Sequence, residues 1–152
     1  MGNITEKKLF EIFQEYATNH GMINDFGVGD YFKIDTKKDR KYPLMWITPK
    51  ATNFKPQENR YSFDVMFADI LDPSETNLVD VWSDMDQLCS DFIRFFNVTY
   101  GQTSGDFYDV YLDSNYTKEP FLNLLDNQCA GYFLRITIIT PFNTSWCINP
   151  QK

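Results

Sequence analysis

The chain has 152 residues, a formal net charge of −7 and an aromatic share of 17%. This length favours a single domain, and the aromatic content excludes a disordered chain. An acidic chain repels phosphates, which excludes sequence-independent binding of nucleic acid as its main role.

The cysteines and the start of the chain indicate a cytosolic setting. Cys89, Cys129 and Cys147 form no CxxC pair, so we expect reduced thiols. The first residues, MGNITEKKLF, lack the apolar run of a signal peptide, and no stretch is long enough to span a membrane. We therefore expect residues 1–152 to form one domain that makes no contact with a membrane.

The first predicted element is a helix from about Ile4 to His20. Asn3 can cap its start, and Glu6 follows at capping-box spacing. Gly21 suits the position after the helix, where φ is often positive. The apolar stripe of this helix contains Leu9, Phe13, Tyr16 and Ala17.

Three strands are predicted next. The first two are DYFKID (30–35) and YPLMWITP (42–49), separated by the basic turn TKKDRK. The third, residues 60–71, is apolar on both faces: Tyr61, Phe63, Val65 and Phe67 alternate with Met66, Ala68 and Ile70. Their connections look too short for a parallel crossover, so we expect an antiparallel meander.

A second helix is predicted over residues 78–97, followed by strands at 107–114 and 130–142 with a surface segment between them. The order α-β-β-β-α-β-β predicts an α+β domain, with a mainly antiparallel sheet of about five strands and two amphipathic helices on one face. Two helices cover one face of such a sheet. We therefore expect a second subunit or a long loop to cover part of the other face.

Few residues suggest catalysis. His20, the one histidine, lies at the predicted end of a helix, where it is expected to interact with the last carbonyls. Cys89 lies on the apolar stripe of the second helix, which favours core packing. The segment around residues 113–124 fails as a calcium loop, because Lys118 and Leu124 replace the required Gly and Glu. The sequence predicts no catalytic centre, no metal and no cofactor.

One enzymatic alternative stays open. Asp35 and Lys37 form the acid-x-Lys pair that metal-dependent nucleases use, with Asp25 or Asp30 as a further acid. The acid-x-Lys pair is common by chance, so the favoured interpretation of the same residues is a solvated turn.

The block from YPLMWITP through RYSFDVMFADIL to VWSDMDQLCSDFIRFF resembles small proteins of tailed bacteriophages. The similarity is to head–tail connector or tail ring proteins of crAss-like phages, and the element order resembles the tail-terminator (tail-completion) fold. The resemblance implies a sheet with two helices on one side and a homo-oligomeric ring around the DNA channel. It also implies contacts with portal, connector or tail proteins in the virion neck or tail, and assembly in the bacterial host cytoplasm. No catalytic residues belong to this family.

Two features are candidate contacts between subunits. The basic turn carries Lys37, Lys38, Arg40 and Lys41, the densest positive cluster in the chain. The second face of the third strand carries Met66 and Ile70, which an interface would cover. A small protein-binding adaptor that uses the same aromatic face is the main alternative to a ring subunit.

Overall fold

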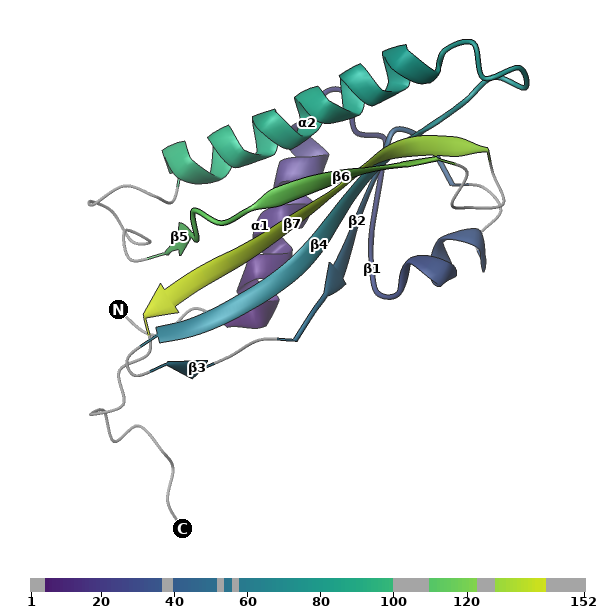
Figure 1. Ribbon diagram of the computed structural model, residues 1–152. Coiled ribbons are helices and arrows are strands. Elements are labelled where there is room, and N and C mark those ends of the chain that lie inside the picture. Colours follow the sequence, from purple (N-terminus) through teal and green to yellow (C-terminus); the bar gives the residue numbers. More distant parts are fainter. Residues whose placement is uncertain are drawn as a thin grey trace.

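A computed structural model describes residues 5–36, 40–51, 54–55, 58–99, 110–122 and 128–141. The elements are, in order, α1 (Glu6–Asn19), β1 (Asp25–Val28), the 3-10 helix η1 (Tyr31–Thr36), β2 (Leu44–Pro49), β3 (Phe54–Lys55), β4 (Glu58–Ile70), α2 (Leu78–Thr99), β5 (Tyr111–Leu112), β6 (Thr117–Leu122) and β7 (Cys129–Pro141). The strands form one sheet in the order β1-β2-β4-β7-β5, while β3 pairs with β4 and β6 pairs with β7 (Figure 1). All pairs are antiparallel except β1 with β2. The predicted α+β class is confirmed.

Both helices pack on the same face of the sheet, as predicted. Apolar residues from α1 and α2 share one core with Phe63, Val65 and Phe67 of β4. Phe92 of α2 is fully buried, and its ring lies 5.7 Å from the ring of Phe13 in α1. The helical spacing of the apolar residues therefore directs both stripes to the sheet.

The ends of α1 differ from the prediction. Thr5 is the N-cap, and its side-chain oxygen accepts a hydrogen bond from the backbone N–H of Lys8 at 3.2 Å. The expected cap, Asn3, lies outside the described residues. The helix ends at His20 in extended backbone (φ −86°), whose N–H donates to the carbonyl of Tyr16. Gly21 therefore does not end the helix with a positive φ.

The second face of the sheet divides into two halves. The apolar half is a smaller core that contains Ile34, Leu44, Trp46, Met66, Ala68 and Cys129. The polar half lies further along the same strands and contains Arg60, Ser62, Asp64, Arg135 and Thr137. The 3-10 helix η1 supplies Ile34 to the apolar half, with Tyr31 packed beside it. A loop of the same chain thus covers this half.

The segment DYFKID was predicted as a strand, and this prediction is wrong. Residues three apart lie on one side of a 3-10 helix, which brings Tyr31 and Ile34 together on the apolar half. In a strand these two side chains would point to opposite faces.

The meander prediction is wrong at the sheet's first edge. β1 runs parallel to β2, with Gly27 opposite Trp46. Residues 29–43 connect the two strands, and this is long enough for a crossover. A Cβ on Gly27 would lie 2.1 Å from the Trp46 ring, so glycine is required where the indole lies against β1. The Trp46 indole N–H donates to the carbonyl of Gly29 at 2.8 Å.

The other edge also differs from the prediction. Residues 117–122, expected as part of a surface segment, form β6, which pairs with β7 from Arg135 to Ala130. β5 pairs with β7 further along, at Ile139 and Ile138. The four residues 113–116 therefore lie opposite only two residues of β7, which makes a bulge at this edge.

Candidate functional site

The described part of the basic turn binds its own domain. The Arg40 Nε–H donates to the carbonyl of Ile34 at 3.1 Å, and the guanidinium lies 4.8 Å from the centre of the Trp46 ring. Its Nη1 lies 3.9 Å from Oδ2 of Asp25, and only 11% of the Arg40 side chain is exposed. Arg40 therefore anchors the turn to the sheet, and its role as a subunit contact stays a prediction.

Lys41, by contrast, is exposed. Its backbone N–H donates to Oδ2 of Asp25 at 3.2 Å. Lys37 and Lys38 lie outside the described residues. Of the four predicted basic contacts, Lys41 is the one that the structure places at the surface.

The acids of the nuclease alternative are only partly described. The Asp35 side chain and Lys37 lie outside the described residues. Asp25 accepts hydrogen bonds from the N–H groups of Phe26 and Lys41 and lies beside Arg40. Its carboxylate therefore holds the turn in place. Over the described ranges, no cluster of three or more His, Cys, Asp or Glu residues could hold a metal ion.

Met66 and Ile70 share a face of β4 but differ in exposure. Met66 is 1% exposed and lies in the apolar half, whereas Ile70 is 45% exposed. The prediction of Met66 as a subunit contact is wrong, because the same chain covers its side chain. Ile70 remains available at the surface.

The sequence analysis missed a row of three aromatic rings on the apolar half. The rings of Tyr31 and Phe133 are 6.2 Å apart, and those of Phe133 and Phe121 are 5.0 Å apart. All three side chains are half-buried. We call Tyr31, Phe121 and Phe133 the aromatic row. Its members come from η1, β6 and β7, and two of these elements were not assigned correctly from the sequence.

The polar half holds its charges in pairs. Asp64 lies 3.4 Å from Lys50 and 3.5 Å from Arg135, and Arg135 lies 2.5 Å from Glu119. Ser62 and Thr137 share a hydrogen bond of 2.9 Å.

A second ion-pair group in this half is centred on Arg60, which lies 2.7 Å from Asp113 and 3.2 Å from Glu58. These hydrogen bonds raise the pKa of Arg60, with the bond to Asp113 the largest cause. The named charges of the polar half therefore bind one another.

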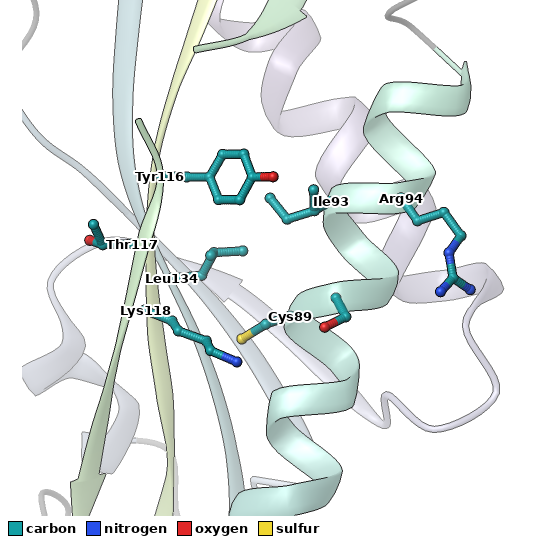
Figure 2. Close-up of a pocket in the computed structure, with 8 residues that line it drawn as sticks. Cys89, Ile93, Arg94, Tyr116, Thr117, Lys118 and Leu134 are labelled. Carbon is teal, nitrogen blue, oxygen red and sulfur yellow. The ribbon is translucent and has the colours of Figure 1, made fainter. Parts of the chain in front are cut away.

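A cleft of about 360 Å³ lies between α2 and β6 (Figure 2). Cys89, Ile93 and Leu134 give it an apolar lining, and Tyr116 extends across it toward α2. Burial raises the pKa of Cys89 to about 12, so its thiol stays protonated at neutral pH. Lys118 pairs with Asp86 and lies 5.4 Å from the centre of the Tyr132 ring. As predicted, Cys89 is a packing residue.

His20 connects the two helices. Its Nδ1 accepts a hydrogen bond from the N–H of Met22 at 3.1 Å, and its Nε2 lies 3.3 Å from Oδ2 of Asp91 in α2. Because Nδ1 accepts, Nε2 carries the proton and donates to Asp91. The predicted partner, the carbonyls at the end of α1, is therefore wrong.

No protein-family model matches the chain, and a search of curated proteins found no significant match. Among the described helices, none combines the length and apolar character needed to cross a membrane.

Proposed function

We propose that the protein is a non-enzymatic structural subunit of a ring in the neck or tail of a tailed bacteriophage. The observation that carries the proposal is the aromatic row, which stays partly exposed on the same sheet face as the exposed side chain of Ile70. Aromatic residues are enriched at protein interfaces, where a partner covers their remaining exposed surface. The row is therefore the apolar surface that a neighbouring subunit or ring would cover.

The fold supports this proposal. The resemblance to phage connector and tail-terminator proteins implied a sheet with two helices on one side, and α1 and α2 have this arrangement (Figure 1). The net charge of −7 agrees with a ring around DNA, because an acidic lining lets the duplex pass without binding it. In this proposal the ring contacts portal, connector or tail proteins and assembles in the host cytoplasm.

The outer edge of β6 is a poor alternative for assembly. Lys118, Glu119 and Pro120 occupy consecutive positions in this strand, and charged residues and proline disfavour pairing with a further strand. The Trp82 indole N–H also donates to the carbonyl of Phe121 at 3.1 Å. We therefore expect subunits to meet through side chains of the sheet face.

The test is Phe121→Glu, with Val79→Glu on α2 as a control, because Val79 is 73% exposed and lies outside both cores. We expect the unmodified chain, alone or with neighbouring phage proteins, to form closed rings by electron microscopy. Phe121→Glu should leave a folded chain by circular dichroism but no rings, whereas Val79→Glu should keep them. Rings that persist in Phe121→Glu would exclude the aromatic row as the contact. Absence of rings with every neighbour would exclude the proposed function.

The same aromatic row supports a second candidate, a monomeric or dimeric protein-binding adaptor. An adaptor would bind one partner through Phe121 while its own mass stayed that of a monomer or dimer. Mass measurement of the complex separates the two functions, because a ring subunit adds several copies to each particle.

A further inference from the structure

A small cleft lies where the carboxyl-terminal ends of α1 and α2 meet. Its volume is about 260 Å³, and it is lined by Glu15, Tyr16, Asn19, His20, Phe95 and Thr99. It is separate from the aromatic row, which lies on the opposite face of the sheet.

The electrostatics of this cleft favour a cation. The last carbonyls of a helix carry a partial negative charge, and neither α1 nor α2 has a basic residue in its last turn. Glu15 adds a carboxylate at the lining, and Asp91 adds another beside His20. Arg94, whose side chain is 72% exposed, lies 4.0 Å from Asp91.

A buried hydroxyl gives independent support for a ligand. Tyr16 lines the cleft and is 6% exposed, yet its hydroxyl is buried without a hydrogen-bond partner in the described structure. A buried polar group without a partner costs free energy, so such groups are rarely left unpaired. The rings of Tyr16 and Phe95, 4.8 Å apart, also provide faces that attract a cation.

We propose that this cleft receives the basic turn, residues 36–41, of a second copy of the chain. The turn carries four basic residues in six positions, in a chain whose net charge is −7. Arg40 anchors the turn to its own sheet, which leaves Lys41 exposed beside it. A lysine ammonium at the cleft can pair with Glu15, and a small shift of the Tyr16 ring, whose hydroxyl is buried, would let that hydroxyl accept a hydrogen bond from it.

The turn and the cleft are different surfaces, so their contact is heterologous and repeats from copy to copy. Contacts of this kind close into a ring when the rotation permits. The inference therefore rests on the proposed ring function, for which it names a second subunit contact.

The experiment exchanges the charges of the two surfaces. One variant carries Lys37→Glu, Lys38→Glu and Lys41→Glu. The other carries Glu15→Lys and Asn19→Lys on α1, which leave the His20–Asp91 bond intact. We expect each variant alone to associate about tenfold more weakly in sedimentation experiments, because like charges then meet. A 1:1 mixture, or one chain that carries all five changes, should recover association.

A matched control is Glu11→Lys with Gln14→Lys, which makes the same charge change on exposed positions of α1 outside the cleft. This control should associate like the unmodified chain. Zero-length carboxylate–amine cross-linking of a mixture of isotope-labelled and unlabelled chains should join residues 37–41 of one copy to Glu15 of another. The cross-link detects the contact even where rings need a template to close.

Tyr16→Phe tests the hydroxyl. Removing an unpaired hydroxyl should leave the melting temperature of the free chain unchanged or higher, while association weakens. If the chain assembles but the exchanged charges and Tyr16→Phe have no effect, and cross-links form elsewhere, the inference fails and the ring function stands. If no assembly and no intermolecular cross-link form with any neighbour, both fail.

Discussion

The apolar half and the polar half of the second sheet face use the same strands, but they are closed in different ways. In the apolar half, η1 folds over β2 and β4 and removes Met66 from water. In the polar half, Arg60, Asp64 and Arg135 neutralise neighbouring charges and stay partly exposed. One face of a sheet thus changes from core to surface within a single strand, where Asp64 is followed two residues later by Met66.

The largest expected effect is that of Met66→Lys. Truncation of a buried methionine to alanine costs about 2–5 kcal/mol, and an ammonium without a partner in the same place costs more. Ile70→Lys, on the same face of β4 but 45% exposed, should change the free energy of unfolding by less than about 0.5 kcal/mol. Urea denaturation measures both. A stable Met66→Lys chain would show that η1 does not close the apolar half.

Gly131→Ala should have the next largest effect. A Cβ at Gly131 would lie 1.8 Å from the backbone carbonyl oxygen of Phe67, which cannot move without shifting β4. Overpacking of this kind costs about 1–3 kcal/mol in urea denaturation. Gly21→Ala is the control, because a Cβ there meets nothing within 4 Å. Equal stability of the two variants would mean that β4 and β7 can move apart near Gly131 at little cost in free energy.

A smaller effect is expected in the polar half, from Arg60→Met. Loss of the guanidinium leaves the carboxylates of Asp113 and Glu58 without the cation that pairs with both. The urea midpoint should fall at low ionic strength, and the fall should shrink in about 1 M NaCl, where charges are screened. Met66→Lys should be less sensitive to salt. A fall that is independent of salt would assign Arg60 a packing role.

The stability of the fold should change with pH because two titratable groups are buried under the helices. Burial raises the pKa of Cys89 from 9.0 to about 12 and raises that of Tyr16 as well. The unfolded chain therefore loses these protons at lower pH than the folded chain does. Stability is full below pH 9.0 and declines as the pH rises toward about 12. The decline can be measured as the urea midpoint at a series of pH values from neutral to alkaline. Cys89→Ala should make the decline less steep. A decline that is equally steep in the variant would mean that the Cys89 thiol is exposed to water.

The sequence predicted the elements that have a clear apolar period. The stripe of α2 and the alternation of β4 and β7 are confirmed because their buried residues repeat at helical or strand spacing. β6 escaped prediction because five of its six residues are exposed, which leaves no alternation to detect. The sequence analysis predicted no strand around Gly27, which lies in β1 and makes room for Trp46.

The candidate site was less predictable than the fold. The basic turn was found by its charge, but the stacking of Arg40 on Trp46 depends on the parallel pairing of β1 with β2, which the sequence analysis missed. The aromatic row combines Tyr31 of η1 with Phe121 and Phe133, which come from β6 and β7 much later in the sequence, so only the tertiary arrangement brings Tyr31 to the other two. The unpaired hydroxyl of Tyr16 has no sequence signal, because it belongs to an ordinary apolar stripe.

The long pairing of β4 with β7 has a consequence for synthesis on the ribosome. Thirteen residues of β4 pair with β7, and even the closest pair, Ile70 with Cys129, is separated by α2, β5 and β6. When α2 leaves the ribosome, β4 can pair with β2 and β3, but the edge that later pairs with β7 still lacks a partner. A nascent chain with an unpaired apolar strand edge is prone to aggregate or to recruit chaperones. We therefore expect the domain to become aggregation-resistant only after Pro141 has emerged, so that chains truncated before β7 accumulate as insoluble protein.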